Sequence, residues 1–168
     1  MNGHPTIQTP NIDGIANKGM VFTQYYSASP ACTASRYALL TGKYPPRSGF
    51  RWVLDPKDPK GIHPQEMTLA EYLKENGYKN ALFGKWHLGS TKSEYSPLQN
   101  GFDEFLGLPY SNDMIPPKYQ DIAFLHNKDT IALNPEQSQL TRQYTEAAME
   151  FMKQNKKDPF FIYLPYAM

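Results

Sequence analysis

Cys32 and Arg36 have the side chains and the spacing for nucleophilic chemistry on an anionic substrate. Cys32 is the only cysteine among the 168 residues, so it has no disulfide partner within the chain. A thiolate is a nucleophile, and an arginine guanidinium presents a fork of donors that suits planar or tetrahedral oxyanions. The two residues are four positions apart, which puts them on one face of the segment if it is helical.

The residues around this pair predict a short helix. Ser29-Pro30 is a turn dipeptide, and the pattern from Thr33 onward is helical with a stop at Gly42. Cys32 would then lie in the first turn, where the helix dipole and the unpaired backbone N–H groups favour an anion. On spacing alone, a small buried cysteine is as good an interpretation as a reactive one. The expected apolar anchors of the helix are Tyr37, Leu39 and Leu40.

A second pair, Lys85 and His87, follows a segment that predicts an amphipathic helix and then a buried strand over 78–83. Thr68 would cap this helix and Gly77 would end it. Its expected apolar residues recur at helical spacing, at Leu69, Tyr72 and Leu73.

Lys85 and His87 emerge where that strand ends, and the carboxyl ends of strands are where open α/β sheets build sites. Since side chains alternate along a strand, both residues would face one side while Trp86 packs on the other. Taken alone, this pair also fits a surface lysine and a hydrogen-bonded core histidine.

Strands alternate with helices along the chain, which predicts an α/β fold with a mostly parallel sheet covered by helices. Further strands are expected over 21–26 and 160–164, and a hairpin over 122–133. A helix over 9–19 would present Ile12 and Ile15 to the core. A helix over 141–153 would turn four residues inward, Tyr144, Ala147, Ala148 and Phe151. Long loops are expected over 43–67 and 90–118, and such loops usually serve function or a partner.

The composition is that of a globular domain. The formal net charge is +1, so there is no basic stripe for nucleic acid. No apolar run approaches the length that spans a bilayer. The length fits one domain with enough apolar residues for a core. We therefore expect neither a nucleic-acid partner nor a membrane.

The segment Cys32-Thr33-Ala34-Ser35-Arg36, with its apolar run and Thr41-Gly42, resembles the first signature of the sulfatase family. Ala34 is the less common of the two family choices at its position. In that family a separate maturing enzyme oxidises the cysteine to formylglycine. The resemblance implies that Cys32 is so modified, that its hydrated aldehyde supplies the nucleophile, and that the modified residue is also a metal ligand.

The segment Gly77-Tyr78 to Leu88-Gly89 resembles the second sulfatase signature, with two departures. Asn80 stands where the family usually has Ser or Thr, and Phe83 stands where it has a smaller residue. Residues 109–113 resemble the loop that supplies a serine, here Ser111, to the sulfate pocket.

The resemblance implies roles for these residues in sulfate ester hydrolysis. Arg36 would hold the formylglycine hydrate, and Lys85 would bridge it to a sulfate oxygen. His87 would take a proton when sulfate is eliminated, and Ser111 would bind substrate. Calcium would neutralise the sulfate oxygens, with Cys32 as the one ligand within this chain.

The resemblance covers nearly the whole chain but not the family's opening strand or its later metal ligands. We therefore expect 1–168 to be a partial sulfatase catalytic domain of alkaline-phosphatase-like architecture, cut at both ends and inactive alone. The expected substrate is a sulfated small molecule or glycan. A periplasmic, extracellular or lysosomal location follows from the resemblance only. Two alternatives remain, a phosphate or phosphonate monoesterase of the same superfamily and a non-catalytic protein with this fold.

Overall fold

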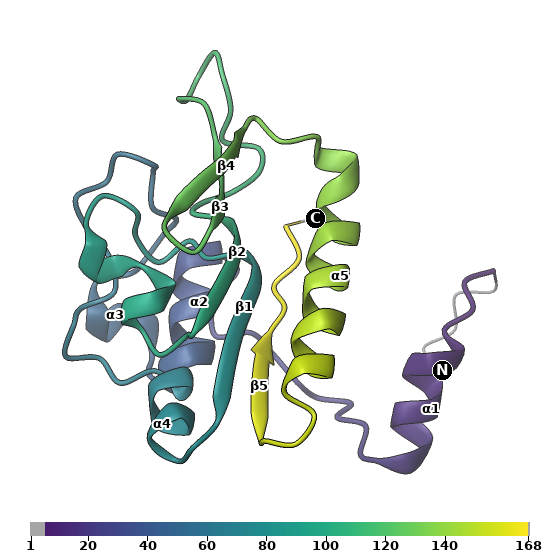
Figure 1. Cartoon of the computed structure of the whole chain (residues 1–168). Helices are drawn as coiled ribbons and strands as arrows, with labels where there is room; N and C mark the ends of the chain where they lie inside the picture. Colours follow the sequence, from purple (N-terminus) through teal and green to yellow (C-terminus); the bar gives the residue numbers. More distant parts are fainter. Residues whose placement is uncertain (1–5, 168) are drawn as a thin grey trace.

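The computed structural model describes residues 6–167, which form a five-stranded sheet with helices on both faces (Figure 1). The strands lie in the order β4-β3-β2-β1-β5. Their bounds are Lys79–Lys85 for β1, Glu104–Leu108 for β2, Ala123–His126 for β3, Asp129–Leu133 for β4 and Phe160–Tyr163 for β5. The helices are α1 (Pro10–Lys18), α2 (Cys32–Thr41), α3 (Pro45–Ser48), α4 (Leu69–Glu75) and α5 (Gln137–Gln154).

The expected α/β class is confirmed, and the sheet is mixed. Strand β1 pairs in parallel with both β2 and β5, whereas β2, β3 and β4 pair antiparallel. The predicted hairpin is β3 and β4, and the predicted strand over 160–164 is β5. The parallel part brings the carboxyl end of β1 beside the carboxyl end of β2, where Lys85 is opposite Leu108.

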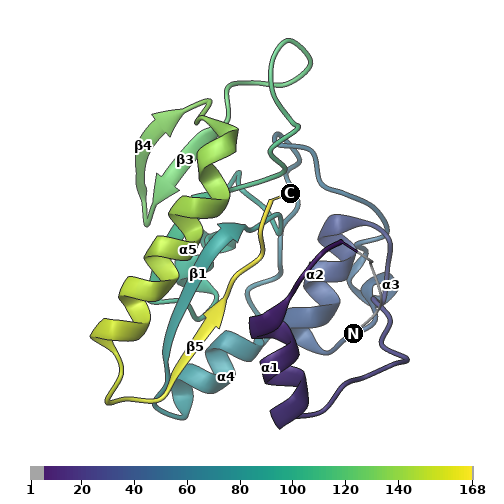
Figure 2. The same cartoon turned by 90° about the vertical axis from the view of Figure 1, so that its right-hand side faces the viewer.

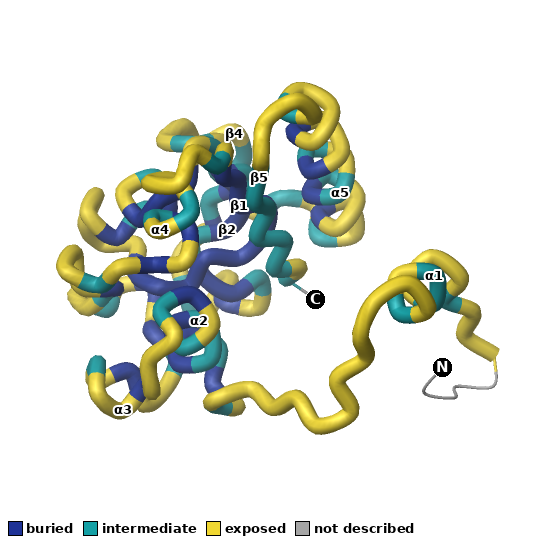
Figure 3. Tube along the Cα trace, turned by 90° about the horizontal axis from the view of Figure 1, so that it is seen from below, coloured by how far each residue is buried: buried dark blue, intermediate teal, exposed yellow. Residues whose placement is uncertain are grey.

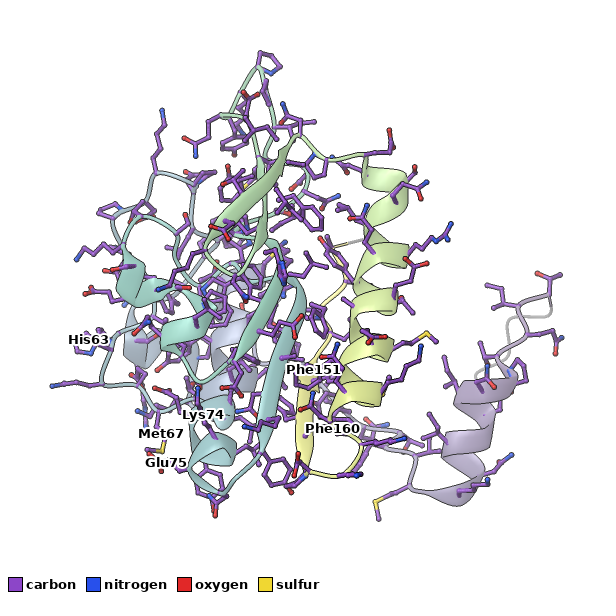
Figure 4. All side chains as sticks on the ribbon, viewed as in Figure 1. His63, Met67, Lys74, Glu75, Phe151 and Phe160 are labelled. Carbon is purple, nitrogen blue, oxygen red and sulfur yellow. The ribbon has the colours of Figure 1, made fainter. Side chains whose placement is uncertain are left out.

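Two apolar clusters fill the space on the two faces of the sheet. Helix α5 covers one face, and α2 and α4 lie on the other (Figure 2). The inward positions predicted for α5 hold, with Tyr144, Ala148 and Phe151 buried and Ala147 packed at the edge of the cluster. Phe151 packs edge to face against Phe160 of β5, with ring centroids 6.4 Å apart (Figure 4).

Helix α4 exists as predicted, but of its three expected apolar residues only Leu73 is partly buried. Thr68 forms a full capping box with Glu71. The buried residue is Ala70, while Leu69 and Tyr72 are exposed. The reason lies in how the helix docks: a Cβ on Gly101 would lie 2.5 Å from the Ala70 carbonyl carbon, so the backbones are in direct contact.

The two family departures in β1 have structural partners. The Asn80 amide donates to the Ala70 and Gly101 carbonyls, at 2.6 and 2.9 Å, and so ties α4 to the start of β2. Phe83 is fully buried and its ring packs against Phe151 of α5. Both residues therefore shape the packing around β1.

Three expectations about the amino-terminal third are wrong. Helix α1 forms, but none of its residues is buried, and Ile12 and Ile15 are exposed. Residues 21–26 form no strand, because this segment runs outside the body of the molecule with no strand to pair with (Figure 3). In α2, Leu39 is exposed, since the helix buries the stripe formed by Thr33, Ala34, Tyr37 and Leu40.

The segment 90–118 was expected to be a loop and contains β2 and two short 3-10 turns. Gly107 in the middle of β2 weakens the strand signal in the sequence. The structure requires this glycine, because a Cβ there would lie 1.8 Å from the Gly84 carbonyl oxygen of β1.

Candidate active site

The candidate residues converge where α2 begins and where β1 ends. Cys32 is the first residue of α2 and is half-buried, and Gly42 closes the helix in the left-handed conformation that glycine favours. Lys85 is the last residue of β1. The predicted positions of these two residues in their elements are therefore confirmed.

Arg36 is anchored to the end of β1. Its Nη1 donates to the Lys85 carbonyl oxygen at 2.6 Å and to the Tyr163 hydroxyl at 3.4 Å. Within residues 6–167, Nε and Nη2 donate to no other residue. One edge of the guanidinium thus fixes its position, while the other donors are available to an anion.

The Lys85 side chain is buried and donates from Nζ to the Ser111 hydroxyl at 2.8 Å. Burial lowers the pKa of Lys85; the Arg36 charge acts in the same direction, and the Cys32 thiol opposes it. The Ser111 hydroxyl in turn lowers the pKa of Asp113 through a hydrogen bond. Cys32, Arg36, Lys85 and Ser111 therefore belong to one electrostatic neighbourhood.

His87 follows β1 with a positive φ of 61°, so strand alternation does not set its direction. Its Nε2 lies 2.8 Å from the Leu54 carbonyl oxygen. Burial lowers the pKa of His87 to about 4; the hydrogen bond to Leu54 opposes the shift, and the Lys85 and Arg36 charges add to it. The imidazole is therefore neutral near pH 7.

Sequence reasoning missed three contributors to this arrangement. The Leu54 carbonyl is a backbone group in an irregular segment, and nothing in a side chain marks it. Tyr163 stood in the predicted strand, without any signal that its hydroxyl reaches Arg36. Asp113 belonged to the motif around Ser111 and was given no role.

Two cavities of about 710 and 450 Å³ lie along the antiparallel part of the sheet. They share the lining residues Ser90, Thr91, Pro109 and Leu125, so they form one groove. Asn127 and Lys128 of the β3–β4 turn line one cavity, and Tyr110, the residue before Ser111, lines the other. None of the five candidate residues lines the groove itself.

No group of three or more His, Cys, Asp or Glu side chains within residues 6–167 is arranged to hold a metal ion. No helix in this part of the chain has the length and apolar character needed to cross a bilayer.

The structure thus has Lys85 at the end of β1 and Cys32 and Arg36 in the first turns of α2, an α/β arrangement whose donors suit a tetrahedral oxyanion. Comparison with known proteins makes the family specific. The sulfatase family model matches residues 1–167, and the chain belongs to the sulfatase family. Its architecture is accordingly alkaline-phosphatase-like, and its sulfatase and arylsulfatase resemblance is confirmed at family level.

Curated relatives are similar over most of this chain. N-acetylgalactosamine-6-sulfatase from Mus musculus is 38% identical over 184 residues, which cover 97% of this chain and 35% of the mouse protein. Arylsulfatase A from Bos taurus is 46% identical over 116 residues, which cover 68% of this chain and 23% of the bovine protein. The chain thus spans about a third or less of the length of these relatives.

A solved structure has the same fold. The crystal structure of Ps i-CgsB in complex with k-i-k-neocarrahexaose superposes with a TM-score of 0.80 at 32% identity. The match covers 98% of this chain and 40% of that chain.

Proposed function

We propose that this chain carries part of the catalytic site of a sulfuric ester hydrolase that cleaves sulfate monoesters. The observation that carries the proposal is the meeting of Cys32 and Arg36, at the start of α2, with the Lys85–Ser111 pair at the end of β1. Membership of the sulfatase family supports the choice of sulfur over phosphorus. Residues 1–168 would form part of one catalytic domain.

Cys32 is the residue that we propose a maturing enzyme converts to formylglycine. Its half-buried position in the first turn of α2 and its influence on the Lys85 ammonium fit a group that must meet an anion. When present, the hydrated aldehyde supplies a hydroxyl nucleophile. Splitting a difficult displacement into two steps in this way is nucleophilic catalysis.

The other residues bind and orient. Arg36, fixed by the Lys85 carbonyl, directs its remaining N–H groups to the modified residue and to sulfate oxygens. Lys85 donates to a sulfate oxygen, where developing negative charge makes the donor more effective, and Ser111, which accepts from Lys85 and bonds to Asp113, holds the ammonium in place beside the sulfate. His87 is neutral near pH 7 and accepts the proton that must leave when sulfate is released.

The resemblance to the sulfatase family implies a calcium ion, but the residues of this chain do not form a calcium site by themselves. Within residues 6–167 no group of three or more His, Cys, Asp or Glu side chains could hold a metal ion, and a hard cation such as calcium takes six or more oxygen ligands. We therefore assign no step of the reaction to calcium, and Cys32 as a metal ligand stays a prediction.

A sulfated sugar is the substrate class that we propose. A relative is named for a sugar sulfate, N-acetylgalactosamine-6-sulfate, and the solved structure named above holds an oligosaccharide. The groove that Tyr110 helps to line has the volume for further sugar units. Its charged lining residues are three lysines, Lys57, Lys92 and Lys128, and two carboxylates, Glu94 and Asp121, so a small excess of positive charge faces a bound glycan. A compartment outside the cytosol would fit such a substrate.

Hydrolysis of an aryl sulfate and of the matching aryl phosphate tests this function, with the full-length protein that contains this chain expressed alongside a formylglycine-generating enzyme. We expect the sulfate to be the better substrate. Cys32→Ala should abolish turnover, because it removes the modified residue. Leu39→Ala, an exposed position of the same helix, is the matched control and should leave the rate unchanged.

A higher rate on the phosphate would favour the phosphomonoesterase alternative. Full sulfatase activity in the Cys32→Ala variant would contradict the proposed mechanism.

A further inference from the structure

Thr33, the residue after Cys32, is fully buried although its side chain is polar. Its Oγ1 accepts a hydrogen bond from the Leu54 backbone N–H at 3.1 Å. Leu54 lies in an irregular segment and belongs to no helix or strand. The bond to Thr33 therefore ties this segment directly to the first turn of α2.

The carbonyl group of the same residue, Leu54, holds His87. The Leu54 carbonyl oxygen is 2.8 Å from His87 Nε2. A carbonyl oxygen only accepts, so Nε2 must carry the proton, and in a neutral imidazole Nδ1 then carries the lone pair. Nδ1 is buried and has no hydrogen-bond partner within the described residues. It is thus the ring atom left to accept a proton.

We propose that Thr33 is a positioning residue for His87: by holding the Leu54 N–H, it fixes the carbonyl that keeps the His87 proton on Nε2 and leaves Nδ1 free as the acceptor. The catalytic part of this inference rests on the proposed function. The positioning itself does not, because it is a property of the folded chain.

The charges around the ring explain why such an anchor matters. Lys85 and Arg36 both oppose protonation of His87, and Asp113 favours it less strongly. The ring therefore stays neutral, and a neutral imidazole can carry its proton on either nitrogen. Without a fixed acceptor at Nε2, the two tautomers would compete, and only one leaves Nδ1 able to take a proton.

Nitrogen NMR of the histidine side chains at pH 7 tests the positioning without any reference to activity. The chain has only four histidines, so a His87→Gln sample assigns the His87 signals. We expect wild type and Thr33→Ser to show a single tautomer protonated on Nε2. Thr33→Val keeps the shape of threonine, loses the acceptor, and should show a mixture of tautomers.

Kinetics of the full-length protein on a sulfate ester gives the second readout. Thr33→Val should lower kcat about tenfold or more with KM nearly unchanged, because a displaced proton acceptor slows the reaction without weakening binding. Thr33→Ser should recover most of the rate. Thr41→Val is the matched control, since Thr41 is at the other end of the same helix, where its hydroxyl donates to the Tyr37 carbonyl and accepts from the Lys43 backbone N–H.

A single Nε2-protonated tautomer in Thr33→Val would overturn the inference. If Thr33→Val does not fold, Thr33→Ala removes the same acceptor with a smaller side chain, and its spectrum decides in the same way. If the full-length wild type hydrolyses no sulfate ester yet the tautomer shifts as described, the positioning stands and the proposed function fails.

Discussion

The candidate site depends on a few side chains, and the sequence does not show the hydrogen bonds that orient Arg36 and His87. The sequence motifs identified Cys32, Arg36, Lys85 and His87, because these residue types and spacings are distinctive. The motifs did not reveal what orients them. Arg36 is held by a backbone carbonyl of β1, and His87 is held by a backbone carbonyl of the irregular segment at Leu54. Every residue type has a backbone carbonyl, so the sequence does not indicate which carbonyl accepts such a bond, and only the fold shows it.

The pKa of His87 makes the stability of the chain depend on pH. This pKa is about 4 in the folded chain, against 6.5 for an unperturbed histidine. Between these two values the unfolded state binds more protons, so the free energy of unfolding should fall as the pH drops from about 6.5 to about 4. The loss should reach up to about 3 kcal/mol at the acid end.

Urea unfolding at several pH values between 4 and 7 measures this dependence. In His87→Gln the amide can still donate to Leu54, and the dependence should become shallower. His63→Gln, which alters an exposed histidine, should keep the wild-type slope. An unchanged slope in His87→Gln would show that other groups cause the acid sensitivity.

At the scale of elements, local patterns predicted which helices and strands form better than they predicted which faces are buried. Capping and glycine signals located α2 and α4, the spacing of apolar residues located α5, and a continuous apolar run located β5. The buried face of α4 could not be predicted, because close backbone contact with Gly101, not an apolar stripe, docks this helix. Strand β2 was missed because Gly107 interrupts its pattern.

The pairing of β1 with β2 should depend on Gly107. A Cβ at this position would lie 1.8 Å from the Gly84 carbonyl oxygen, and a backbone atom in the middle of a sheet cannot move aside cheaply. We expect Gly107→Ala to lower the free energy of unfolding by about 3 kcal/mol or more.

Gly14→Ala is the matched control for Gly107→Ala, because a Cβ there meets nothing within 4 Å. It should change the free energy of unfolding by at most about 1 kcal/mol. Equal effects of the two substitutions in urea unfolding would contradict the close approach of β1 and β2.

At the scale of the whole molecule, the structure consists of a packed body and an amino-terminal arm that extends away from it, with α1 at the far end (Figure 3). The arm meets the body at α2, where the Ser27 and Ser35 hydroxyls are 2.6 Å apart. The arm comprises α1 and the segment up to residue 30. Its apolar side chains were expected to be buried because of their type, but within the described residues no surface covers them. The two sequence signatures of the family lie in the packed body, at α2 and β1.

The arm should be the first part of the chain that a protease removes. Phe22, Tyr25 and Tyr26 are exposed and lie in no helix or strand, so little local unfolding precedes cleavage there. Brief chymotrypsin treatment, read by mass spectrometry, should give products that begin between residues 23 and 27. Earlier cleavage after Trp52, which is equally exposed within the body, would show that the arm is protected.

The central claim is that Cys32 is converted to formylglycine for sulfate ester hydrolysis, and the mass of one peptide tests it most directly. Trypsin cuts after Lys18 and Arg36, so Cys32 lies in the peptide 19–36. From a host that contains a formylglycine-generating enzyme, this peptide should lose one sulfur and two hydrogens, gain one oxygen, and react with an aldehyde reagent. An unmodified thiol at Cys32 in every such preparation would contradict the account.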